Sequence, residues 1–241
     1  MTATAFALIG DRFHNSDYIR TGLSKVLVEG LDLAVDFTDD LHALSADNLA
    51  RYDLLIVFRD GMVWPDGYGS GSPYPGYDPA VQGTLSQPPV PELAPQAVQW
   101  ITPAQGKAAL FYHNSTYITA SADFSHVQGS TTEGHPPVRP FKVTITNKDH
   151  PITQDVGDFV VTDEQHYMAY AKDPAHILAR SINEEGHDFN GLGNECEAAW
   201  AYDYGRGRVC YLAPGHTISA LWNPEYAKLQ QNATKWLLRQ I

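Results

Sequence analysis

Polar side chains capable of acid–base or metal chemistry follow directly after several apolar runs of this 241-residue chain. The clearest case is "GKAALFYHNST" (106–116), where the apolar run stops at an imidazole and an amide. A Ser or Cys at that position would indicate acyl transfer, whereas His113 indicates a proton carrier, a metal ligand or an orienting group, and Asn114 a hydrogen-bond donor. Similar positions after other apolar runs are 11–14 (Asp11 to His14), Asp60 and His216.

Whether these positions form one site depends on the fold. In open α/β sheets, ligands bind at the carboxyl ends of the strands, so polar residues at separate strand ends can converge on one site. The alternative for each residue is that it only caps a local helix or turn. We expect convergence.

A second group of ionisable residues lies in "VVTDEQHYM" (160–168). If this stretch is extended, Glu164 and His166 lie on the same face and Asp163 on the other. Three ionisable residues in one strand are locally unfavourable, which indicates either a functional site or an edge strand that faces water.

Two histidines lie in rigid turns, His135 in "EGHPP" and His150 in "HPIT". The proline after each histidine disfavours helix there, so each is a candidate site residue or a group that only satisfies nearby backbone. Cys196 and Cys210 are too few for a disulfide framework and too far apart for a zinc module, which favours a reducing compartment.

The elements expected to position these residues alternate between strands and helices. Residues 5–10, 31–37 and 54–58 and the run "KAALFY" predict strands, and 16–30 and 91–106 predict helices. Continuous apolar strands between helices indicate a parallel sheet covered on both faces. Residues 61–91 hold seven of the sixteen prolines and six glycines, so they predict an active-site lid or insertion, or else a surface excursion that packs on itself.

Strands dominate from residue 136 onward, among them one over "DFVVTDEQHYMAY". "DYGRGR" predicts a hairpin with positive φ at Gly205 and Gly207. The segment "NPEYAKLQQNATKWLLRQI" predicts a closing amphipathic helix with Pro in its first turn, whose apolar face comprises Tyr226, Leu229, Ala233, Trp236 and Leu237.

Composition limits the partners. The formal charge of −12 and the lack of a basic run argue against nucleic acid and anionic membranes. The first apolar stretch is too short for a signal peptide or a membrane span, so we expect a cytoplasmic protein of one domain, residues 1–241.

The chain resembles the ThuA-like (trehalose utilisation) family of the class I glutamine amidotransferase-like superfamily. The resemblance is carried by "DRFHNSDY", "GKAALFYHNST", "EGHP", "DHPIT", "DFVVTDEQHY", "AAWAYDYGRGRVCYLAPGHT" and "LWNPEY". It implies a flavodoxin-like three-layer α/β/α sandwich without the nucleophilic Cys, with a mostly parallel sheet and antiparallel strands towards the C-terminus. Two features depart from the family pattern: 61–91 is longer and richer in proline, and "DEQHY" has an extra residue.

The resemblance also implies one cleft lined by recurrent polar positions. The candidate catalytic residues are His113, Glu164, His135 and His216, and the candidate substrate-binding residues are His14, Asp60, Asn114, His166 and Trp222. The expected ligand is a small sugar such as a 3-keto-glycoside, with elimination, hydration or hydrolysis as the reaction.

In that chemistry Glu164 or His113 is the base, while His135 and His216 stabilise the enolate, directly or through a divalent metal such as zinc. No local HxH or HExxH spacing supports the metal. The alternatives are a non-catalytic sugar-binding or regulatory module and an amidotransferase-like hydrolase without its nucleophile. Whether the chain forms a homo-oligomer stays open.

Overall fold

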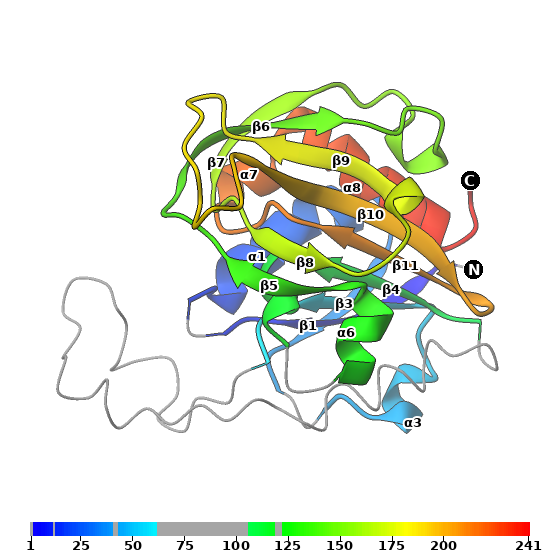
Figure 1. Cartoon of the computed structure of the whole chain (residues 1–241). Helices are drawn as coiled ribbons and strands as arrows, with labels where there is room; N and C mark the ends of the chain where they lie inside the picture. Colours follow the sequence, from blue (N-terminus) through cyan, green and yellow to red (C-terminus); the bar gives the residue numbers. More distant parts are fainter. Residues whose placement is uncertain (1, 12, 41–42, 62–105, 119–121) are drawn as a thin grey trace, which may run out of the picture.

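A nine-stranded sheet frames the computed structural model, which describes residues 2–11, 13–40, 43–61, 106–118 and 122–241 (Figure 1). Five strands run parallel in the order β2-β1-β3-β4-β11, which is the flavodoxin-like order. Their bounds are β1 Thr4–Ile9, β2 Ala34–Thr38, β3 Leu54–Phe58, β4 Ala108–Tyr112 and β11 Gly207–Leu212.

Antiparallel strands extend the sheet beyond β11 in the order β10-β9-β6-β7. They are β10 Glu195–Tyr204, β9 Ile177–Ile182, β6 Arg139–Ile145 and β7 Phe159–Asp163. The burial of β7 alternates residue by residue, whereas β3 and β4 are buried throughout. This difference is typical of an edge strand against central parallel strands. The strand pairings confirm the predicted α/β class and the antiparallel C-terminal part.

The two faces of the sheet are covered by different elements. Phe111 packs on Phe124 of α6 (Ala122–Gln128), whereas the next residue, Tyr112, donates to Gln230 of α8 (Pro224–Leu237). Because neighbouring residues of a strand point to opposite faces, α6 and α8 lie on opposite sides, which gives three layers (Figure 1).

The remaining helices are short or composite. Residues 16–31 form one helix in three parts, α1 Ser16–Leu23, the π-helical η1 Ser24–Val28 and α2 Glu29–Leu31, where a single helix was predicted. The others are α3 Ala46–Leu49, η3 His113–Tyr117, η4 Pro151–Thr153, η5 Pro174–His176 and α7 Ile218–Leu221. In the part of the chain that the structure describes, no helix has the length and apolarity needed to cross a bilayer.

Three details differ from the sequence predictions. The single strand expected over "DFVVTDEQHYMAY" is broken after Asp163, and β8 (Tyr167–Tyr170) pairs instead with β5 (Ser130–Gly134) in a separate sheet. The hairpin after β10 has positive φ at Gly205 only, since Gly207 already pairs with Tyr204 in β11. The lid predicted over 61–91 and the helix predicted over 91–106 fall almost wholly outside the described residues.

The closing helix follows the prediction closely. Asn223 caps its start, Pro224 occupies its first turn, and all five residues of the predicted apolar face are buried. The helix packs on β4 and β11, the two strands that deliver His113 and His216.

Candidate active site

One carboxylate oxygen, Glu164 Oε2, is surrounded by five imidazoles. The nearest ring nitrogens are His216 Nδ1 at 3.2 Å, His113 Nε2 at 3.3 Å and His166 Nε2 at 3.4 Å. His135 Nε2 follows at 3.6 Å and His14 Nε2 at 3.9 Å. The structure therefore brings together residues that the sequence separates by up to 202 positions.

Strand ends account for this convergence. His14 follows β1, His113 follows β4 and His216 follows β11, which are three parallel strands that end at the same edge of the sheet. Glu164 and His166 lie in the break between β7 and β8, and the two remain in contact although neither belongs to the strand expected there. His135 follows β5.

His113 is held in a conformation that few non-glycine residues adopt, with φ at +46°. Its carbonyl accepts a hydrogen bond from the Tyr211 hydroxyl (2.7 Å), and its Nδ1 donates to the carbonyl of Ala213 (2.8 Å). Gly215 lies so close that a Cβ there would be 2.7 Å from the Cβ of His113. The β11 segment and the loop after it thus fix the position of the imidazole.

Asp11 joins the ends of three strands. Its Oδ1 accepts from Nδ1 of His14 (3.0 Å), and its Oδ2 accepts from the backbone N–H of Asp60 (3.1 Å) and from the side-chain amide of Asn114. Asn114 and Asp60, both predicted to bind substrate, therefore take part in the support of His14. All four residues are buried.

Asp163 supports the candidate site in a way that the sequence did not reveal. Its Oδ1 accepts from the backbone N–H groups of Glu164 (2.9 Å) and His216 (3.1 Å), and its Oδ2 from that of Thr217 (3.0 Å). One fully buried carboxylate thus ties the end of β7 to the loop that carries His216. The signal was only that an Asp precedes Glu164, because the other two partners lie more than 50 residues away.

Opposite charges within the site stabilise one another. Burial opposes the ionisation of both members of the Asp11–His14 pair, but their mutual attraction outweighs it, lowering the pKa of Asp11 to about 2 and raising that of His14 to about 10. Burial likewise opposes ionisation of Glu164, yet the surrounding imidazoles, His113 first, hold its pKa well below the usual range.

The environment of the two fully buried imidazoles, His113 and His166, favours their neutral form. Burial lowers the pKa of His113, and the positive charge of His14 lowers it further. Burial also lowers the pKa of His166, with a further contribution from His113. A neutral imidazole offers one lone pair, so these rings can accept a proton or bind a metal.

The side chains of the site differ in their exposure to solvent. The side chain of His135 is 30% exposed, that of His216 17% and that of Glu164 11%, while those of His113 and His166 are fully buried. The Tyr117 ring lies beside the rings of His135 and His166 at centroid distances of 6.4 and 5.8 Å. A ligand would therefore meet His135 and His216 before the inner rings.

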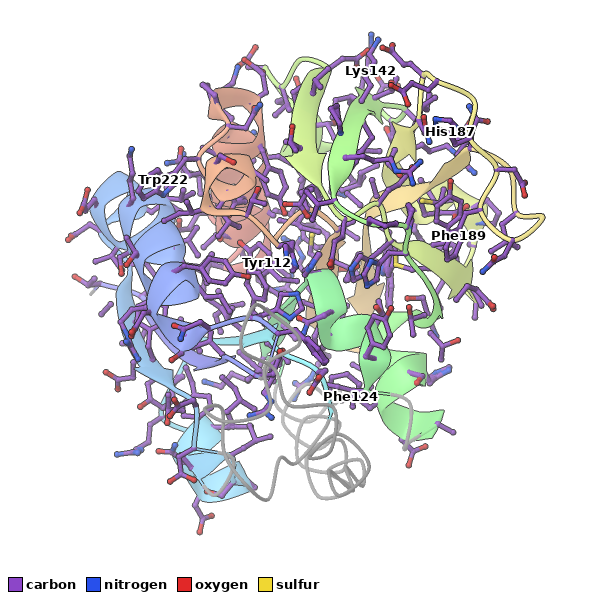
Figure 2. The ribbon with its side chains drawn as sticks, turned by 90° about the vertical axis from the view of Figure 1, so that its left-hand side faces the viewer. Tyr112, Phe124, Lys142, His187, Phe189 and Trp222 are labelled. Carbon is purple, nitrogen blue, oxygen red and sulfur yellow. The ribbon has the colours of Figure 1, made fainter. Side chains whose placement is uncertain are left out.

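Trp222 does not join this group. Its indole N–H donates to the carbonyl of Gly22 (3.3 Å), and Lys25 Nζ lies 4.1 Å from the ring centroid, so it packs against the α1–η1 helix (Figure 2). His150 accepts the N–H of Ile152 and packs on Trp236, which is the local role that the sequence left open. His187 lies away from the site, on the loop between β9 and β10, and pairs with Glu185 (Figure 2).

Metal-binding potential is concentrated at Glu164. Among the residues that the structure describes, two groups of possible metal ligands include this carboxylate, and within each group the ligand atoms lie within 4.8 Å of one another. The first adds His14, His113 and His216, and the second adds His135 and His166. Both cysteines are buried, free and absent from these groups.

The fold and the site together define a flavodoxin-like α/β protein with a histidine–carboxylate centre at the carboxyl ends of its parallel strands. The ThuA family model, described as trehalose utilisation, matches residues 92–237. Since that is more than half of the chain, the protein belongs to the ThuA family. No curated protein matches the chain.

Solved structures share the fold at low sequence identity. A ThuA-like protein from Parabacteroides merdae has a TM-score of 0.72 at 16% identity, covering 100% of this chain and 91% of its own. A ThuA-like protein from Bacteroides uniformis has a TM-score of 0.68 at 15% identity, covering 98% of this chain and 91% of its own. A cytoplasmic protein from Salmonella typhimurium has a TM-score of 0.58 at 16% identity (98% and 99% covered).

Proposed function

We propose that this protein is a carbohydrate-processing enzyme that abstracts the proton beside the keto group of a 3-keto-glycoside. The observation that carries the proposal is the group of five imidazoles around Glu164, of which His135 and His216 are the most exposed to solvent. The family description, trehalose utilisation, supports a sugar substrate.

The chemistry needs a base and a stabilised oxyanion. A keto group at C3 acidifies the proton on C2, and removal of that proton gives an enolate that can expel the substituent on C1. Positive charge or hydrogen-bond donors beside the keto oxygen lower the barrier, typically by several kcal/mol.

We base the proposed roles on exposure and charge, and they differ from the sequence expectation that Glu164 or His113 is the base. Glu164 is a poor proton acceptor because its pKa lies well below the usual range, and His113 is sealed from solvent. His135 is the most exposed of the five imidazoles and lies 3.6 Å from Glu164 through Nε2, so it is the proposed proton carrier. His216 is proposed to stabilise the enolate oxygen, and Glu164 to orient both rings.

We also propose the class of ligand and the cellular location. We propose a small sugar derivative as the only substrate partner, since the chain carries a charge of −12 and has no basic run. Two free, buried cysteines and the description of the Salmonella relative support a cytoplasmic location.

Exchange of the C2 proton tests the function directly. Incubated in D2O with 3-keto-trehalose, the wild-type protein should incorporate deuterium at C2, observed by proton NMR. His135→Ala should slow the exchange about 10²-fold or more, as expected for loss of a general base. His187→Ala, a change at a mostly exposed histidine outside the site, should leave the rate unchanged. Ligand binding without exchange would refute the enzyme and favour a sugar-binding module.

A further inference from the structure

Three of the five imidazoles have a fixed tautomer. Nδ1 of His113 faces the Ala213 carbonyl at 2.8 Å, and Nδ1 of His135 faces the Pro136 carbonyl at 3.0 Å. Nδ1 of His14 lies 3.0 Å from the Asp11 carboxylate and 2.9 Å from the Asn114 amide nitrogen, which itself donates to the other oxygen of Asp11. Carbonyl and carboxylate oxygens only accept, so each Nδ1 carries a hydrogen and each neutral ring has its lone pair on Nε2.

Those lone pairs all point at an anion. The Nε2 atoms of His113, His135 and His14 lie 3.3, 3.6 and 3.9 Å from Glu164 Oε2. Nε2 of His113 is buried and has no hydrogen-bond partner among the residues that the structure describes. A lone pair that faces a carboxylate in a buried site is unfavourable unless positive charge lies between them.

Protons on these nitrogens are a poor source of that positive charge. They would make neighbouring rings cationic, and the ring centroid of His14 lies 4.9 Å from that of His113 and 5.0 Å from that of His216. Like charges at that separation in a buried site repel strongly. One divalent cation would satisfy the lone pairs of His113 and His14 at once.

We infer that the site binds one divalent transition-metal ion of the zinc class through His14 Nε2, His113 Nε2, His216 Nδ1 and Glu164 Oε2. These four atoms lie within 4.8 Å of one another. Metal–ligand bonds of about 2.0–2.1 Å in a tetrahedron place ligand atoms about 3.3–3.4 Å apart. The observed separations from Glu164 Oε2 are 3.2 Å to His216 and 3.3 Å to His113, and His14 Nε2 lies 3.1 Å from His216 Nδ1.

The surroundings support this ligand set. Metal-bound imidazoles donate their other N–H to a carboxylate or a carbonyl, which is what Asp11 and Ala213 accept from His14 and His113. Three nitrogens and one carboxylate oxygen suit zinc and related transition metals, whereas magnesium and calcium prefer oxygen ligands. The inference goes beyond the proposed function, which assigns proton transfer to His135 outside this set.

Metal content and the spectrum of the cobalt form test the inference. Protein stripped by chelator and dialysed against zinc should retain one zinc per chain by mass spectrometry. With cobalt in place of zinc, the visible d–d bands should have the intensity of four-coordinate nitrogen and oxygen ligation. His187→Ala should keep both properties, and magnesium should not compete.

Variants of the ligands complete the test. His113→Ala and His216→Ala should lose stoichiometric zinc, and Asp11→Asn, which removes the carboxylate that accepts from His14 Nδ1, should weaken zinc binding about 10–100-fold. His216→Ala replaces a partly exposed ring, so it keeps the test valid if the His113 variant does not fold. Circular dichroism checks the folding of both variants. Retention of one tightly bound zinc by both ligand variants, or no zinc in the wild type, would overturn the metal site. Zinc binding without C2 exchange would support it while refuting the proposed function.

Discussion

Glu164 is the residue on which the chemistry of the site depends. Its position after an apolar run, two residues before His166, identified it from the sequence as a functional candidate. Its contacts with His14 and His216 depend on strand ends that meet only in the folded sheet. Residue types could therefore be predicted from the chain, but the atoms that face one another could not.

Asp163 shows why the supporting residues escape sequence reasoning. The alternation of an extended strand places it on the face opposite to Glu164, which suggests no role in the site. In the structure its carboxylate accepts the backbone N–H groups of Gly215, His216 and Thr217, residues that follow a different strand. Nothing in the local sequence encodes partners at that distance.

Asp163→Asn should destabilise the protein by about 1.5–3 kcal/mol, because hydrogen bonds to a buried charged acceptor are lost and an amide N–H would face backbone donors. Urea denaturation measures this change, and deuterium exchange at C2 should fall with it because His216 loses its anchor. Asp203→Asn is the matched control, since that side chain is 71% exposed and forms one ion pair with Arg208. Asp203→Asn should lower the free energy of unfolding by less than about 1 kcal/mol. Equal effects of the two variants would contradict the role of Asp163.

Strand ends position the site at the scale of elements. The apolar runs at 5–10, 54–58 and "KAALFY" correspond to β1, β3 and β4, because continuous burial on both faces leaves a clear sequence pattern. The break after Asp163 left no such pattern. Gln165 turns inward there and donates to the carbonyls of Ser181 and Asn194, partners that only the fold supplies.

The loop after β11 approaches the end of β4 so closely that only glycine fits at residue 215. An added Cβ would lie 2.6 Å from Cζ of Phe58 and 2.7 Å from Cβ of His113, which no side-chain rotation of the new alanine can relieve.

Gly215→Ala should therefore cost about 1–3 kcal/mol through overpacking. A shift of this loop also moves the adjacent His216, so C2 exchange should slow by up to about 10²-fold. Thermal or urea unfolding and the exchange rate measure the two effects. In Gly157→Ala the nearest atom outside the local chain is Glu225 Oε2 at 3.4 Å, an ordinary contact, so this control should change neither quantity appreciably. Wild-type behaviour of Gly215→Ala would show that the approach is not tight in solution.

At the scale of the whole molecule, one sheet carries both the parallel strands and the antiparallel extension. The parallel part places His14, His113 and His216 at one edge, and the broken β7–β8 segment brings Glu164 and His166 to the same point. The α/β class was predictable because period and composition determine it, whereas the pairing of β5 with β8 in a second sheet depends on tertiary contacts.

The gathering of five imidazoles around one carboxylate is the feature from which every functional statement follows. Nitrogen-15 NMR of histidine side chains observes it directly in solution. On Glu164→Gln, the imidazole nitrogens of His14, His113, His135, His166 and His216 should all shift, because each loses the same neighbouring charge. The nitrogens of His126, His150, His176 and His187 should stay where they are in the wild type. Unchanged shifts for the buried rings of His113 and His166 would contradict the site.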